Sequence, residues 1–121
     1  MIRLIVDMPD ATTIYVPAPC RGNLSGMKAV FQTNAVDAGD TLVAYRDTTA
    51  VNTLTVVNGS GLVVETGVPD VTNKGLIFDP ADTTVVNQVI KIVNTGAPGA
   101  SIVELQFDEY AYVKQTPLEA I

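Results

Sequence analysis

The fold class is decided by two apolar runs: Val85-Val86-Asn87-Gln88-Val89-Ile90-Lys91-Ile92-Val93 and, after turn residues 94–100, Ser101-Ile102-Val103-Glu104-Leu105-Gln106-Phe107. In the second run Val103, Leu105 and Phe107 alternate with polar side chains. This alternation is the pattern of a strand with one face in the core and the other in water. We therefore expect residues 85–107 to form a long antiparallel hairpin. Gln88 and Lys91 fall on opposite phases, which predicts a bulge or a twist near Val89.

Short runs of the same kind recur along the rest of the chain. They are rich in Val, Ile, Thr and Tyr, and turn signals such as Asn58-Gly59 and Asp79-Pro80 separate them. No segment shows the helical period over ten or more residues. The sequence predicts an all-β antiparallel sandwich, jelly-roll-like, of about nine strands. The expected strands cover residues 2–6, 12–16, 27–33, 41–45, 54–57, 62–65, 75–78, 85–93 and 101–113.

Length and composition predict a single domain. The chain has 121 residues, of which 47% are hydrophobic and 17% charged, so it can bury one core and is unlike a disordered chain. No linker or repeat divides it. We expect a sandwich domain over residues 1–113 and a C-terminal tail over residues 114–121. Two interpretations of the tail stay open: a free end, or a segment that docks on a neighbouring molecule through Leu118 and Ile121.

Charge excludes two classes of partner. Thirteen acidic and seven basic residues give a net charge of -6, and the basic residues are scattered singly. Nucleic acids and anionic membrane surfaces attract concentrated basic patches, so neither is an expected partner. No apolar stretch approaches the ~20 residues of a membrane span. The single Cys20 cannot form an internal disulfide, which suits synthesis in the cytoplasm.

The residues of the common catalytic sites are missing or isolated. The chain contains no His, so it lacks the commonest general base and metal ligand. Only Arg21 stands beside Cys20 to lower its pKa, so Cys20 is interpreted as a small buried side chain. Carboxylate pairs such as Glu104 with Asp108 carry no distinctive spacing. We predict that the protein is not an enzyme and needs no cofactor.

Two further groups of residues are candidate binding sites. Asp79 and Asp82 offer oxygen ligands for a cation, but Asp followed by Pro is also an ordinary turn opener. The sequence favours the turn and leaves cation binding open. Tyr110 and Tyr112 share one strand face, where they form either a protein interface or a second core layer.

The second half of the chain resembles a known group of viral proteins. Its segments Gly75-Leu76-Ile77-Phe78-Asp79-Pro80, residues 83–88, residues 90–93 and residues 101–107 are similar to the small jelly-roll decoration, or cement, proteins on the capsids of tailed bacteriophages. The acidic, His-free, Thr-rich composition is similar as well. The likeness lies in architecture and style and covers no diagnostic motif.

The resemblance implies a structural virion protein, made in the host cytoplasm, that decorates the outer capsid surface and bridges major capsid proteins. It also implies a homo-oligomer, with a trimer favoured and a dimer possible. Terminal arms and outward tyrosines are the expected contacts. The candidate interface residues are Ile2, Leu4, Tyr110, Tyr112, Leu118 and Ile121. The alternative is a carbohydrate- or receptor-binding module of a fibre or spike, with a groove lined by Tyr110 and Tyr112.

Overall fold

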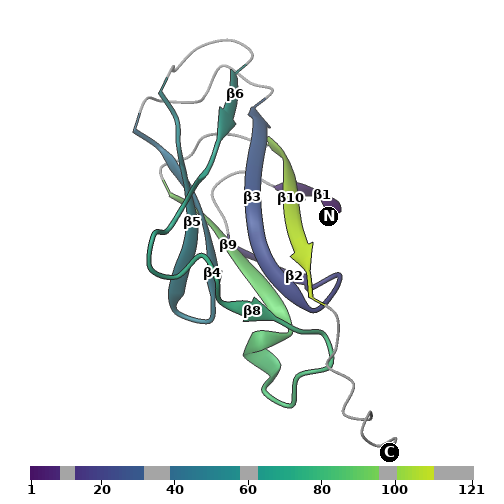
Figure 1. Cartoon of the computed structure of the whole chain (residues 1–121). Coiled ribbons are helices and arrows are strands. Elements are labelled where there is room, and N and C mark those ends of the chain that lie inside the picture. The colour runs from purple at the N-terminus through teal and green to yellow at the C-terminus, as the bar shows by residue number, and fades with distance from the viewer. Residues whose placement is uncertain (9–12, 32–38, 58–62, 96–100, 111–121) are drawn as a thin grey trace, which may run out of the picture.

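The computed structural model describes residues 1–8, 13–31, 39–57, 63–95 and 101–110, and these residues form two antiparallel sheets packed as a sandwich (Figure 1). The first sheet has the order β1 (Ile2–Met8), β10 (Ser101–Glu109), β3 (Gly22–Phe31) and β6 (Val63–Thr66), and β8 (Ile77–Phe78) also pairs with β3. The second has the order β2 (Thr13–Pro17), β9 (Val89–Thr95), β4 (Thr41–Arg46), β5 (Thr49–Thr55) and β7 (Val68–Pro69). The prediction of a single-domain antiparallel sandwich is confirmed.

The eight longer strands are connected as a jelly roll. The first strand pairs with the last, β1 with β10, and the pairs β2–β9, β3–β6 and β4–β5 follow inward along the chain. Successive pairs lie alternately in the first and the second sheet. When the two halves of a chain run antiparallel and their strand pairs alternate between two sheets, they form two Greek keys, and this is the jelly-roll arrangement.

The predicted hairpin over residues 85–107 is wrong. β9 lies in the second sheet and β10 in the first, so the two strands face each other across the core instead of pairing. Residues 85–88 are not extended either, because Val85–Asn87 form a short 3₁₀ helix, η1, and β9 begins at Val89. The phase break near Val89 is therefore the start of the strand and not a bulge.

A bulge does occur in β3, which starts at Gly22 and not at the predicted residue 27. The register between β10 and β3 shifts at Gln106/Phe107, opposite the extra residue Ser25. The Ser25 hydroxyl donates a hydrogen bond to the Gln106 carbonyl at 3.1 Å. Residues 23–26 have low strand propensity, so pairing with β10 determines their conformation. The predicted boundary between domain and tail, at residues 113 and 114, lies outside the described residues.

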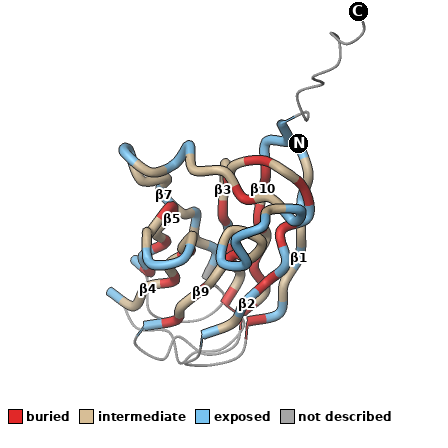
Figure 2. The backbone as a smooth tube through the Cα atoms, turned by 90° about the horizontal axis from the view of Figure 1, so that it is seen from below, coloured by how far each residue is buried: buried red, intermediate tan, exposed pale blue. Residues whose placement is uncertain are grey.

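The core fills the space between the two sheets, where Figure 2 shows the buried positions. Alternate side chains of the long strands point inward, as Val103, Leu105 and Phe107 do in β10. Phe107 meets Phe78 of β8 edge to face, with ring centroids 6.2 Å apart. Two apolar inner faces then leave two outer faces for solvent or partners.

Candidate protein interface

The strands of the second sheet contain no acidic residue, although the chain as a whole carries a net charge of -6. Leu42 and Ala44 of β4 point into the core, so Val43 points outward. At the end of β4, the Arg46 guanidinium donates a hydrogen bond to the Ile77 carbonyl of the first sheet, at 2.9 Å.

The register aligns one row of outward side chains across all five strands. This row consists of Thr13, Val93, Val43, Thr53 and Val68. The outer face of this sheet is called here the uncharged face because its strands hold no carboxylate, and apart from the ammonium of Lys91 it is an apolar and hydroxyl-bearing surface.

A second row crosses the uncharged face beside the first. Its members are Tyr15 of β2, Lys91 of β9 and Tyr45 of β4, which stand opposite one another in register. The Lys91 Nζ lies 4.9 Å from the centroid of the Tyr45 ring. This is a cation–π contact, which holds the ammonium over the sheet and orients it toward β4. Tyr15 is 66% exposed, so its ring is free for contact.

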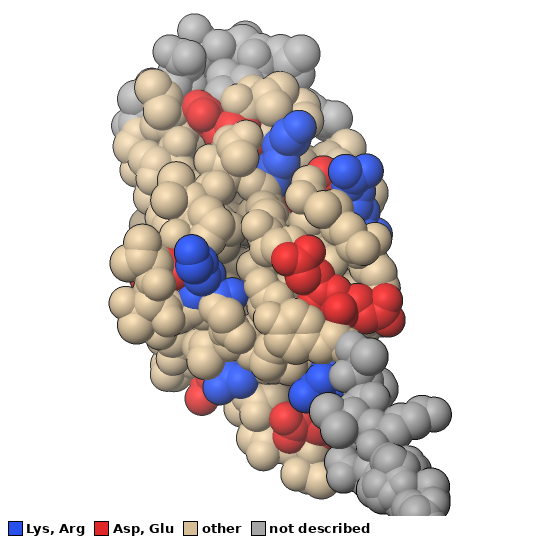
Figure 3. All heavy atoms as spheres, in the orientation of Figure 1, with Lys and Arg blue, Asp and Glu red and all other residues tan. Residues whose placement is uncertain are grey.

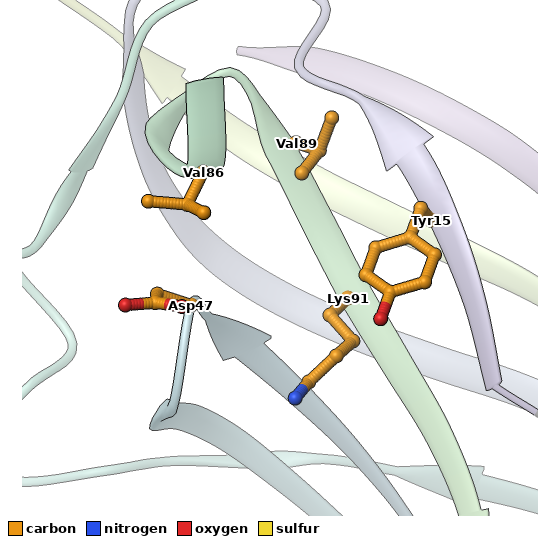
Figure 4. Close-up of a pocket in the computed structure, with 5 residues that line it drawn as sticks. All are labelled: Tyr15, Asp47, Val86, Val89 and Lys91. Carbon is orange, nitrogen blue, oxygen red and sulfur yellow. The ribbon is translucent and has the colours of Figure 1, made fainter. Parts of the chain in front are cut away.

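A pocket of about 140 Å³ opens at this row (Figure 4). Tyr15, Val89 and Lys91 come from the paired strands β2 and β9, Val86 comes from η1, and Asp47 comes from the turn between β4 and β5. Asp47 has a φ of 58°, in the left-handed region that Asp tolerates better than most residues. This turn conformation places Asp47 at the rim of a pocket that also contains one ammonium group, and Figure 4 shows its carboxylate turned away from Lys91.

Lys91 and Asp47 are not paired with each other. The ion pairs found among the described residues are Arg3 with Glu104, at 3.9 Å, and Arg21 with Asp79, at 3.7 Å. The contact of Lys91 with Tyr45 leaves its ammonium N–H groups available to an oxygen from outside the molecule. The pocket thus adds one positive charge, from Lys91, and one negative charge, from Asp47, to the uncharged face.

The outer face of the first sheet has a different character. Its strands place Arg3, Asp7, Lys28 and Glu104 outward together with apolar side chains such as Ile5, which is 61% exposed, and Glu104 also accepts a hydrogen bond from Gln106 Nε2 at 3.0 Å. Figure 3, which looks at the side of the sandwich where both sheets are seen in Figure 1, shows acidic and basic side chains interspersed over that side of the molecule. Mixed charges of this kind are typical of solvated surface. The uncharged face is therefore the better candidate for a protein contact.

Of the six residues proposed from the sequence, the structure places Ile2 and Tyr110 near one end of the first sheet and Leu4 further along β1, opposite Leu105. Ile2 stands opposite Phe107, and the Tyr110 amide donates a hydrogen bond to the Arg21 carbonyl at 2.7 Å. Tyr110 is 41% exposed. Ile2 and Leu4 are half-buried and pack against the core, because β1 is the edge strand of its own sheet and not a free arm. Tyr112, Leu118 and Ile121 lie outside the described residues.

The two aspartates considered as cation ligands hold turns. The Asp79 carboxylate accepts a hydrogen bond from the Ala81 amide at 2.9 Å, and that of Asp82 accepts one from the Thr84 amide at 2.7 Å. Asp82 also anchors η1, since its second carboxylate oxygen accepts from Asn87 Nδ2 at 3.3 Å. Within the described part of the chain no three His, Cys, Asp or Glu side chains gather as metal ligands would.

Cys20 is buried, with 6% of its surface exposed. Burial raises the pKa of its thiol above the usual value, and the nearby Glu109 carboxylate raises it further. A raised pKa keeps the sulfur protonated near neutral pH, and the thiol is a weak nucleophile. Cys20 therefore has a packing role at the end of the first sheet.

Comparison of the chain with family models, with curated proteins and with solved structures finds no significant match. No helix in the described ranges has the length and apolarity to cross a membrane. The fold and the two outer faces are thus the basis on which a function is proposed.

The row of Tyr15, Lys91 and Tyr45 is not among the sites that the sequence predicts. One feature of the sequence does point to it. The alternate positions 13, 15 and 17 hold no acidic residue, and neither do positions 89, 91 and 93. The strand register is needed to bring the two segments side by side and to add β4 next to them.

Proposed function

We propose that this protein is a structural component of a virus particle that decorates the outer surface of a phage capsid and bridges major capsid proteins. It acts by binding and not by catalysis, and it reaches the capsid after synthesis in the host cytoplasm. The observation that carries the proposal is that the domain offers two separate surfaces for protein contacts. One is the end of the first sheet, where Met1 and Tyr110 are exposed, and the other is the uncharged face, whose strands hold no carboxylate in a protein with a net charge of -6. Such a surface is typical of a protein contact.

The fold adds support. A jelly roll closes its core on both sides, so a domain of this size is rigid and exposes two broad faces without any cofactor. Repeated copies on a lattice let modest contacts act together through multivalency. An acidic surface elsewhere keeps the free protein soluble before it assembles.

The end of the first sheet is the proposed capsid contact. Both Met1, which is 71% exposed, and Tyr110 lie there, next to the paired ends of β1 and β10. An exposed tyrosine gives a large contact area at a small entropic cost. This assignment leaves the uncharged face available for another copy or another protein.

Co-sedimentation with capsids of the phage whose genome encodes the chain tests the proposal. We expect the purified protein to pellet with assembled capsids, to saturate at a fixed number of copies per lattice unit, and to stay in the supernatant with free capsid subunits. Protein that remains in the supernatant with mature capsids would contradict the proposal.

Tyr110→Ser tests the assigned contact in the same assay. We expect it to weaken capsid binding by about tenfold, the loss that follows when a large interface side chain is truncated. Val57→Ser is the matched control, because Val57 is also an exposed apolar residue, at 68%, and stands in a different loop. Equal binding by both variants would remove the end of the first sheet as the contact.

A second candidate function is carbohydrate or receptor binding, and the pocket beside Tyr15 favours it. An exposed tyrosine ring stacks on a sugar face, while Lys91 and Asp47 offer a hydrogen-bond donor and acceptor to hydroxyl groups. A glycan array with the purified protein tests this candidate. Binding of one glycan class that is lost in Tyr15→Ala would support it, and an array without any signal would eliminate it.

A further inference from the structure

We propose that the uncharged face joins two copies of this chain about a two-fold axis, with Lys91 of each copy against Asp47 of the other. The inference rests on the proposed function only in requiring a role in assembly, and it can be tested without a capsid. It names the occupant of the face, a second copy in a dimer rather than in the trimer that the resemblance favours, and the two residues that set its orientation.

The first step concerns charge. Two molecules that each carry a net charge of -6 repel one another least when they approach through surfaces that are poor in acidic residues. The strands β2, β9, β4, β5 and β7 contain no Asp or Glu, whereas β1, β10 and β6 do. A second copy therefore meets the least repulsion at the uncharged face.

The second step concerns self-complementarity. In a two-fold interface each contact occurs twice, because residue i of one copy meets residue j of the other and the reverse. Lys91 and Asp47 line the same pocket, and no ion pair joins them within the described chain. A two-fold axis through the pocket brings each ammonium to the other copy's carboxylate. The cation and the rim anion of the pocket are thus both neutralised.

The third step concerns shape and area. Four strands of five to seven residues lie about 4.8 Å apart and are roughly 20 Å long, and the two-residue β7 extends the sheet at one edge, so the face is on the order of 20 Å by 20 Å. The total accessible surface buried on both copies, including the uneven surface that side chains add, is on the order of 1,000 Å². This is the lower limit for a specific interface. We therefore expect a dimer that dissociates in the micromolar range. With so little area, the two Lys91–Asp47 pairs determine which orientation forms.

Charge reversal tests the inference directly. Lys91→Glu places two acids opposite each other at both contacts of a dimer, and Asp47→Lys places two bases there. We expect each variant alone to dimerise at least about tenfold more weakly than the wild type, because juxtaposed like charges oppose association.

A one-to-one mixture of the two variants should form a heterodimer. At one contact the introduced glutamate of the first variant meets the introduced lysine of the second. At the other contact the unchanged Asp47 of the first variant meets the unchanged Lys91 of the second. Both contacts of the mixed dimer therefore join opposite charges again.

Sedimentation equilibrium from low micromolar to near-millimolar protein gives the mass of each sample. Lys28→Glu and Asp7→Lys are matched controls, since they make the same charge changes on the outer face of the first sheet. Both should keep the wild-type dissociation constant within about twofold. Thermal unfolding should confirm that all variants are folded.

The outcomes separate cleanly. Wild-type protein that stays monomeric over the whole range overturns the inference, and so does an oligomer that the Lys91 and Asp47 reversals leave intact or that the controls weaken equally. Failure of the mixture to pair also overturns it, if each variant is folded. Capsid co-sedimentation is a separate readout: a dimer that ignores capsids removes the proposed function alone, and a monomer that pellets with capsids removes this inference alone.

Discussion

Gly22 illustrates how single residues limit this fold. It lies in β3 beside the end of β10, and a Cβ atom at this position would collide with the carbonyl oxygen of Asp108. Its φ is ordinary, so the requirement comes from the close approach of two backbones and not from an unusual conformation. Gly75, in contrast, has open space around the position of a Cβ atom.

Gly22→Ala should lower the free energy of unfolding by about 1–3 kcal/mol, because the added methyl must push two paired strands apart. Gly75→Ala is the matched control and should change it by less than about 1 kcal/mol, in the stabilising direction if at all. Urea unfolding followed by circular dichroism measures both. Equal effects of the two substitutions would contradict this account of Gly22.

Cys20 gives a pH dependence whose sign follows from burial. The folded state raises the pKa of the thiol, so above about pH 9.0 the unfolded chain loses the proton first. The free energy of unfolding is then unaffected by this group below that pH and falls as the pH rises through the folded pKa.

We expect Cys20→Ala to lose this component. Its stability, measured by urea unfolding at about pH 8 and about pH 10.5, should fall less than that of the wild type over the same interval. The other titrating groups are common to both proteins and cancel in the comparison. A steeper fall for the variant would reverse the assigned sign.

The strands differ in how much of their backbone is protected. β10 lies between β1 and β3, and β9 lies between β2 and β4, so both strands are paired on two sides. β1 pairs with β10 alone among the described strands, which leaves an open edge. The open edge is blunted by Arg3 and Asp7, whose exposed charges discourage pairing with another chain.

Amide hydrogen exchange should therefore be slowest in β9 and β10 and faster at alternate amides of β1, since half of these point away from the sheet. Exchange measured residue by residue by NMR at low protein concentration tests this order. Uniform protection along β1 would show that its outer edge is covered, contrary to the topology found here.

At the scale of the whole molecule, the jelly roll pairs the beginning of the chain with its end. Ile2 stands opposite Phe107, and Thr13 stands opposite Val93. To form these pairs the chain must close long loops, and the entropy lost in closing them is compensated only later, when the strand contacts form. The same wrapping makes both sheets depend on one another, because consecutive strands such as β9 and β10 belong to different layers.

Refolding from urea should accordingly take milliseconds to seconds, the range of folds dominated by non-local strand pairs. Stopped-flow tyrosine fluorescence measures the rate, since the chain has four Tyr and no Trp. Refolding within microseconds would contradict the role of these long-range pairs.

We also expect a chain that lacks residues 1–8 to remain unfolded, because Met8 is buried and Ile2 and Leu4 pack on the core.

The sequence by itself determined the fold class and the absence of His chemistry, because alternation within β10 and the residue composition are local properties that no partner strand can change. The tertiary structure alone decided that β9 and β10 face each other across the core, that η1 interrupts residues 85–93, and that Tyr15, Lys91 and Tyr45 form one row. Strand pairing joins residues far apart in the chain, and its energy depends on register and on burial of both faces together. For that physical reason the uncharged face became visible only once the strands were assembled.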